Sequence, residues 1–160
     1  MREYLFRGIP NLDQEDLERI GVKLDEGFVY GNLIWNNGNP FIVGNVTEAN
    51  EDYINIEEWI PVKPETVGES TNTKAINFAT KKKEEVFEDD ILAFAIRDDL
   101  GDIQHYKGVV YLCTGAFWID CTTDKNKDNE ALFGLGNVLS EDENTLIIGN
   151  IHNDPKLISM

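Results

Sequence analysis

The sequence of 160 residues has few cysteines and lacks the long apolar segments that determine the fold or location of many other small proteins. It contains only two cysteines, which cannot form the disulfide framework of a small secreted domain. No apolar run approaches the ~20 residues of a membrane span. The N-terminus also lacks a basic segment followed by an apolar stretch of signal length. We therefore expect a cytoplasmic chain with its own core and no membrane partner.

Basic residues are scarce too. The chain has 14 Lys and Arg against 30 Asp and Glu, a net charge of −16, and each half of the chain carries −8. Acid spread in this way repels a phosphate backbone, so we expect no direct nucleic-acid partner. The simpler interpretation is a solvated surface that confers solubility. The alternative is a mimic of nucleic-acid charge that blocks a host enzyme.

Motifs that carry chemistry are also missing. The chain has no Walker-type loop or Rossmann fingerprint, and the isolated Gly134-Leu135-Gly136 is typical of a flexible turn. Four side chains could ligate zinc, but none are spaced as the close pairs of a zinc site: His105, Cys113, Cys121 and His152. Residues 124–128 are spaced like a calcium loop, yet its required Gly is Asn129 and its required Glu is Leu135. We expect no metal, no cofactor and no catalytic residue.

The sequence does contain short segments rich in β-branched and aromatic residues, separated by Asn, Gly and Asp. They predict strands at residues 4–7, 28–35, 40–46, 53–59, 91–97, 103–112, 116–121 and 145–152. Helical periodicity is best at residues 13–20, where Asp13 can cap the helix and Gly21 can end it. The expected fold is mainly β, with antiparallel hairpins that close as a small barrel or sandwich and one short N-terminal helix.

One hairpin is predicted at Asn37-Gly38, because this pair favours the positive φ that both central turn positions need. The turn places Ile34 opposite Phe41 and Leu33 opposite Ile42. Both faces then carry apolar pairs, so another part of the fold or another chain must cover at least one of them. We take these four residues as a candidate interaction surface, which makes a homo-oligomer plausible.

A second hairpin is predicted at Thr114-Gly115, with two apolar pairs on its core face: Val110 with Ile119 and Leu112 with Phe117. The same register places Cys121 opposite Gly108, five residues along the ladder from Cys113. At ~3.3 Å per residue, the two thiols are too far apart to form a disulfide.

The outer face of this second hairpin pairs Tyr111 with Trp118 and Val109 with Asp120. An aromatic pair beside a carboxylate can bind a ligand or a partner protein, because Tyr and Trp combine a flat apolar surface with a polar group. The same pair can equally be a cross-strand contact that supports the sheet. We add Tyr111, Trp118 and Asp120 to the candidate surface.

Two acidic runs remain. Residues 84–90 follow three lysines, which predicts a loop in which opposite charges offset each other. Residues 98–102 predict a turn between two strands. Paired carboxylates can catalyse hydrolysis when a cleft holds them at a defined separation, so a small carboxylate-dependent hydrolase near Tyr111 and Trp118 is a further alternative.

Six segments together resemble the YopX-like family of phage and prophage proteins. They occur in the family's order and span nearly the whole chain, at residues 4–8, 28–33, 62–68, 86–92, 108–111 and 148–155. The resemblance implies a mainly β protein with a small SH3-like barrel, encoded by phages or prophages of Gram-positive bacteria. It implies no assigned activity and brings no catalytic residues.

The chain departs from this family between Gly68 and Glu88, where residues 71–83 form a longer segment. Asp89 also stands where the family has a glycine before Ile91. If that glycine needs positive φ, we expect the turn before Ile91 to be rebuilt, at a cost of ~1 kcal/mol unless the loop relaxes. The barrel itself should survive.

These features predict a phage accessory protein that acts as a non-catalytic protein-interaction module. We expect residues 1–62 to form an N-terminal β-hairpin arm and residues 63–160 to form the barrel, together making one compact unit. The partner protein cannot be named from the sequence.

Overall fold

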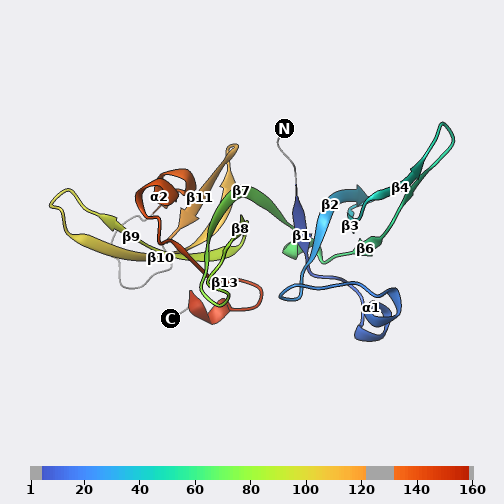
Figure 1. The fold of residues 1–160 in the computed structure, drawn as a ribbon, viewed down its shortest axis with the longest axis horizontal. Helices are drawn as coiled ribbons and strands as arrows, with labels where there is room; N and C mark the ends of the chain where they lie inside the picture. The colour runs from blue at the N-terminus through green and yellow to red at the C-terminus, as the bar shows by residue number, and fades with distance from the viewer. Residues whose placement is uncertain (1–4, 122–131, 159–160) are drawn as a thin grey trace. The chain divides into compact units, whose positions relative to one another are not determined.

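The computed structural model describes residues 5–121 and 132–158 (Figure 1). The chain divides into two units, residues 1–70 and residues 71–160. We had placed the boundary at residue 62, but the segment that follows stays with unit 1. Thr66 Oγ1 accepts a hydrogen bond from the Ile9 N–H at 2.9 Å, and Glu69 pairs with Phe6.

Unit 1 contains six short strands, one helix and one 3-10 turn: β1 (Phe6–Gly8), α1 (Gln14–Ile20), β2 (Val29–Asn36), β3 (Asn39–Val43), β4 (Val46–Ala49), β5 (Ile54–Ile56), β6 (Trp59–Pro61) and η1 (Pro64–Thr66). The predicted strands at 40–46 and 53–59 are each divided. Their outer parts form a separate hairpin, β4–β5, which projects away from β2 and β3 in Figure 1.

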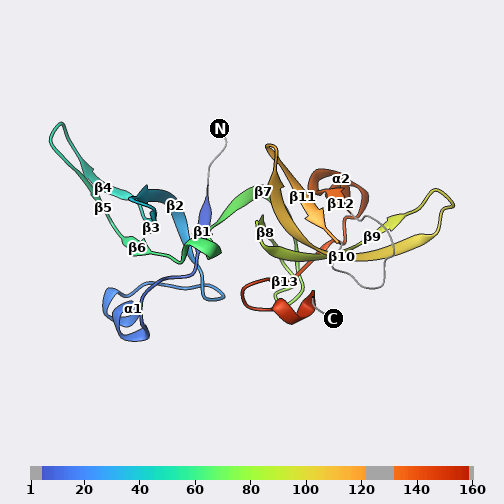
Figure 2. The same ribbon diagram turned by 180° about the vertical axis from the view of Figure 1, so that it is seen from behind.

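Strand β7 (Gly68–Asn77) begins in unit 1 and continues into unit 2. The remaining elements of unit 2 are β8 (Lys83–Phe87), β9 (Asp90–Arg97), β10 (Ile103–Cys113), β11 (Ala116–Asp120), β12 (Leu132–Gly134), α2 (Leu135–Glu141), β13 (Leu146–Asn150) and η2 (Pro155–Leu157). Helix α2 lies beside β11 in both views and beside β12 in the view from behind (Figure 1, Figure 2).

The mainly β prediction is confirmed. Eleven strands are hydrogen-bonded in the order β12-β11-β10-β9-β13-β7-β1-β2-β3-β6, with β8 also paired to β7. The sheet is mixed, because β13 runs parallel to β7, whereas we had expected antiparallel pairs alone. The order ends at β12 and at β6, so no closed barrel is detected in the part of the chain that the structure describes.

The predicted N-terminal helix is confirmed as α1. The Asp13 carboxylate caps it by accepting a hydrogen bond from the Asp16 N–H at 2.8 Å, which satisfies one of the amides left open at a helix start. Gly21 ends it at φ 75°, in the left-handed conformation that glycine adopts readily. The second helix, α2, was not predicted. It begins at Leu135, within the Gly134-Leu135-Gly136 segment that we had interpreted as a flexible turn.

Each unit has its own apolar core. The core of unit 1 is small and is built from four buried residues: Val29, Ile42, Ile60 and Val62. The core of unit 2 is larger, because α2 packs Leu135 and Val138 onto the sheet. Its remaining members come from the strands and the residue after β11: Ala75, Val86, Leu92, Phe94, Val110, Ile119, Cys121 and Ile147.

Candidate functional site: the exposed apolar faces of two hairpins

The β2–β3 hairpin has the register that its turn predicts. Asn37 and Gly38 have φ of 51° and 79°, as a turn with two left-handed positions requires. Ile34 pairs with Phe41, and Leu33 pairs with Ile42. The prediction for this hairpin is confirmed residue by residue.

One face of this hairpin belongs to the core of unit 1. Ile42 is 1% exposed and pairs with Ile60 of β6, while Leu33 packs against the same cluster. We had expected Ile42 in the interaction surface, but its side chain is buried in the core cluster of unit 1 and is not available there. Leu33 is half-buried and contributes little surface.

The opposite face is less covered. Ile34 and Phe41 are half-buried on it, and β6 adds Trp59, which is 47% exposed. The rings of Phe41 and Trp59 meet edge to face, with centroids 6.2 Å apart. We call Ile34, Phe41 and Trp59 the Phe41 face. The sequence did not indicate that Trp59 joins it, because β6 reaches β3 only after the excursion through β4 and β5.

The β10–β11 hairpin also has its predicted register, around Thr114 and Gly115 at φ 49° and 78°. Val110 and Ile119 pair on the core face and are fully buried. Leu112 was expected in the core as well, but it is 41% exposed because it lies next to the turn.

The outer face of β10–β11 pairs Tyr111 with Trp118 and Val109 with Asp120, and all four residues are half-buried. Partial burial raises the pKa of the Tyr111 hydroxyl, and Cys113 and Asp120 add smaller effects in the same direction. Aromatic packing is concentrated on the other face of this sheet, where Phe94 and Tyr106 contact Phe133.

The two cysteines are separate, as predicted. Cys113 is exposed beside the turn, whereas Cys121 is fully buried, and neither forms a disulfide. Cys121 lies directly against Gly108, where an added Cβ would come within 2.5 Å of its sulfur.

The acidic run at residues 84–90 is not the loop that we expected. Most of it forms β8 and the start of β9. Asp90 is 3% exposed, and its carboxylate accepts a hydrogen bond from the Phe87 N–H at 2.8 Å. The carboxylate therefore closes the turn between the two strands.

The turn at residues 98–102 is confirmed. Asp98 Oδ1 accepts hydrogen bonds from the N–H groups of Asp102 and Leu100 at 2.9 and 3.0 Å. These amides hold the pKa of Asp98 below its ordinary value, with the Asp102 amide as the main cause. The Asp98 carboxylate is therefore already hydrogen-bonded within the turn.

Asp89 lies between β8 and β9 with a left-handed backbone conformation. Its φ is 69°, which is the positive φ that we had considered for this position. The backbone N–H of Asp89 donates to the Val110 carbonyl at 2.9 Å, and its carboxylate lies 2.9 Å from His152 Nε2. The left-handed strain, of order 1–2 kcal/mol, is thus opposed by the carboxylate contact with His152, which a glycine could not make. We assign this pair the structural role of fixing the C-terminal segment to the β8–β9 turn.

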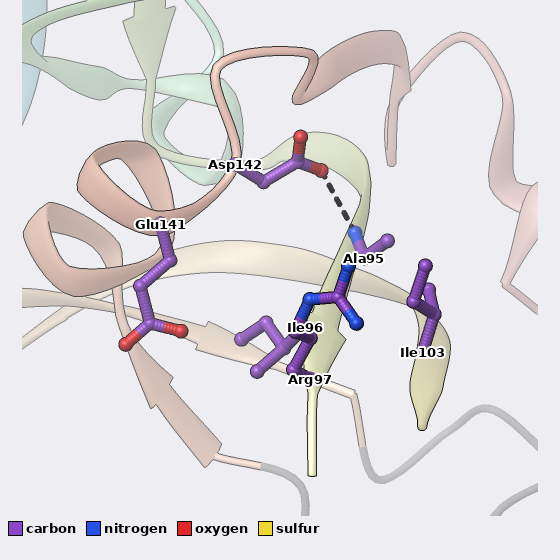
Figure 3. Close-up of a pocket in the computed structure, with 6 residues that line it drawn as sticks. All are labelled: Ala95, Ile96, Arg97, Ile103, Glu141 and Asp142. Carbon is purple, nitrogen blue, oxygen red and sulfur yellow. Dashed lines mark hydrogen bonds between the residues drawn. The ribbon is translucent and has the colours of Figure 1, made fainter. Parts of the chain in front are cut away.

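A pocket of about 360 Å³ lies beside the end of β9 and the C-terminus of α2 (Figure 3). Its lining contains three charged side chains, Arg97, Glu141 and Asp142. The Asp142 carboxylate is already engaged, since it accepts hydrogen bonds from the Ala95 and Asn144 N–H groups. None of the residues lining the pocket belongs to the Tyr111 and Trp118 face, where the hydrolase alternative had placed its acids.

No group of three or more His, Cys, Asp or Glu side chains within residues 5–121 and 132–158 could hold a metal ion. The calcium-like segment at 124–128 lies outside the described residues. Neither α1 nor α2, the α-helices of the described chain, is long and apolar enough to cross a membrane.

Comparison with family models, with curated proteins and with solved structures finds no match to this chain. The resemblance to YopX-like phage proteins therefore stays a prediction from the sequence.

Proposed function

We propose that this chain is a non-catalytic protein-interaction module, acting in the cytoplasm of a phage-infected host. The observation that supports the proposal best is the Phe41 face, where apolar side chains of the paired strands β2, β3 and β6 remain partly exposed. Aromatic side chains on such a surface are typical of the centre of a protein interface. The resemblance to YopX-like proteins, a family without assigned activity, agrees with this proposal.

The test compares two exposed tryptophans on opposite faces of the same sheet, Trp35 on β2 and Trp59 on β6. Trp59→Ser alters the Phe41 face, whereas Trp35→Ser alters the other face, where Trp35 is 54% exposed near the turn. The tagged protein and both variants are used to capture proteins from a lysate of an infected Gram-positive host, at low and at high salt. Circular dichroism checks that both variants keep the fold.

We expect a partner that is retained at high salt by the unmodified protein and by Trp35→Ser, but is lost with Trp59→Ser. Equal retention by all three proteins, or no retained partner at all, would contradict the proposal. A nucleic-acid-processing enzyme that is released by salt and is insensitive to Trp59→Ser would instead favour the charge mimic, because screening weakens contacts between exposed charges.

A further inference from the structure

The β4–β5 hairpin of unit 1 is separate from the main sheet. In the described structure its two strands pair with each other and with no strand of the 11-stranded sheet. Three large apolar side chains are nonetheless exposed on it: Val46 at 58%, Tyr53 at 46% and Ile54 at 63%. An isolated two-stranded hairpin is only marginally stable in water, so a surface that packs against it would stabilise it.

The charge on this hairpin has one sign. Residues 44–58 contain five acidic residues and no Lys or Arg: Glu48, Glu51, Asp52, Glu57 and Glu58. The Tyr53 hydroxyl donates to Glu48 Oε1 at 2.8 Å, which fixes one carboxylate, while Glu51 and Asp52 are exposed at the tip. We call residues 44–58 the acidic arm. Its chemistry fits a partner that is basic and offers apolar contact.

A surface of that chemistry is present in unit 2 of the same chain. Residues 71–83 contain no acid but hold four of the 14 basic residues: Lys74, Lys81, Lys82 and Lys83. All four are exposed, and none forms an ion pair with a described residue. No other ten consecutive residues of the sequence contain four Lys and Arg.

This basic segment also has an exposed aromatic ring and a fixed shape. Phe78 is 55% exposed, and the Lys81 ammonium lies 3.8 Å from the centroid of its ring. Asn77 Oδ1 accepts hydrogen bonds from the Ala79 and Thr80 N–H groups at 2.9 and 3.2 Å, which hold the turn between β7 and β8. We call residues 74–83 the basic turn. It needs little reorganisation to bind.

We propose that the acidic arm of one copy binds the basic turn of a second copy. The two surfaces carry opposite charges and both expose apolar side chains, and no ion pair of the lysines with a described residue would have to be displaced. Two chains of −16 repel each other at long range, but that repulsion is screened beyond ~8 Å at physiological salt. The charges within contact distance therefore decide the interaction. The inference rests on the proposed function and names a second copy as a partner.

The experiment uses two charge-reversed variants of the full chain. Glu51→Lys with Asp52→Lys alters the arm, and Lys82→Glu with Lys83→Glu alters the turn. Sedimentation velocity over a wide concentration range measures self-association. We expect the dissociation constant to rise roughly tenfold or more in each variant, because attraction is replaced by repulsion at two positions.

Mixing the two variants gives the decisive result. The arm variant retains an unmodified basic turn, and the turn variant retains an unmodified acidic arm, so an equimolar mixture can form one native contact between two chains. We expect the mixture to associate more tightly than either variant alone. If the mixture associates as weakly as either variant alone, the proposal is overturned. The same result is expected if the acidic arm and the basic turn contact each other only within one chain.

Matched controls separate this contact from a general effect of net charge. Glu15→Lys with Glu143→Lys, and Lys23→Glu with Lys156→Glu, change the net charge by the same amounts at exposed positions elsewhere. Both controls should associate like the unmodified protein. The self-association proposal would be contradicted if the protein were monomeric at all concentrations. It would also be contradicted if the controls weakened association as strongly as the arm and turn variants do. Salt-resistant partner capture that depends on Trp59 would then still support the proposed function.

Discussion

The two hairpins β2–β3 and β10–β11 have the same turn geometry but are built from different residues. Both use two left-handed turn positions, with φ of 51° and 79° in the first and 49° and 78° in the second. The first uses Asn37, which tolerates this conformation, whereas the second uses Thr114, a β-branched residue that does not. Tertiary pairing therefore imposes the turn at Thr114, while at Asn37 the local preference agrees with it.

The surroundings of the two hairpins explain why the second can tolerate strain. The pair of Val110 and Ile119 is fully buried in the larger core of unit 2, whereas in the corresponding Leu33–Ile42 pair of the first hairpin only Ile42 is fully buried, in the smaller core of unit 1. Burial of large aliphatic side chains contributes about 1.5–3 kcal/mol each. That exceeds the ~1–2 kcal/mol of left-handed strain at one residue.

The largest expected effect is removal of an isoleucine from either core. Ile119→Ala and Ile42→Ala should each lower the free energy of unfolding by ~2–5 kcal/mol. We expect Ile119→Ala to have the larger effect, because the more extensive core around it can relax less. Urea denaturation measures the loss, and hydrogen exchange should locate it in unit 2 for Ile119→Ala and in unit 1 for Ile42→Ala. Leu112→Ala, at an exposed position beside the turn, is the control and should cost under ~1 kcal/mol.

A somewhat smaller effect is expected from filling the space at Gly108. An added Cβ would lie 2.5 Å from Cys121 Sγ and 2.6 Å from the Asp120 carbonyl oxygen, which belongs to the backbone and cannot rotate away. Gly108→Ala should therefore destabilise the protein by ~1–3 kcal/mol. Gly136→Ala in α2 is the control, since nothing lies within 4 Å of its added Cβ. Equal stability of both variants in urea would show that the β10–β11 hairpin is not closely packed there.

The same contrast indicates what the sequence can predict. Signals between near neighbours were reliable: the Asn37-Gly38 turn, the Asp13 cap and the Gly21 stop all lie where their local chemistry places them. The pairing of Phe41 with Ile34 followed from the Asn37-Gly38 turn. Trp59 was missed, because its place beside Phe41 depends on a strand that returns after the acidic arm.

Two elements that depend on distant partners, β7 and α2, were not predicted. Strand β7 is rich in polar residues, and its Ser70 and Thr71 are buried, which no apolar alternation indicates. Thr71 Oγ1 is satisfied by the Val86 carbonyl at 2.8 Å, on a strand fifteen residues away. Helix α2 begins without a side-chain cap and is stabilised by burial of Leu135 and Val138. A pattern of neighbouring residues indicates neither a hydrogen-bond partner that is distant in sequence nor burial by the rest of the fold.

A reciprocal exchange of turn residues tests the comparison directly. Thr114→Asn should stabilise the protein by ~1 kcal/mol, because asparagine tolerates the left-handed conformation that threonine resists. Asn37→Thr should destabilise it by a similar amount for the same reason. Both changes are measured as shifts of the urea midpoint at constant slope. If the urea midpoints of both variants shift in the same direction, backbone strain in the turn does not distinguish the two hairpins.

The smallest effect at neutral pH comes from the tyrosines on the first strands of the two hairpins, and it appears only in alkali. Burial raises the pKa of Tyr30 to about 12, although the nearby charge of Arg7 offsets part of the rise.

Between its unfolded pKa of about 10 and its folded value, the unfolded chain releases the Tyr30 proton while the folded chain retains it. The free energy of unfolding should therefore be unaffected by this group below pH ~10 and should fall as the pH rises toward 12. Tyr30→Phe should flatten this fall in urea denaturation. Tyr111→Phe should flatten it less, because Tyr30 lies beside the buried Phe28 ring, whereas Tyr111 lies on a half-buried outer face. If the alkaline slope of Tyr30→Phe matched that of the unmodified protein, Tyr30 would have to ionise as readily in the folded chain as in the unfolded one.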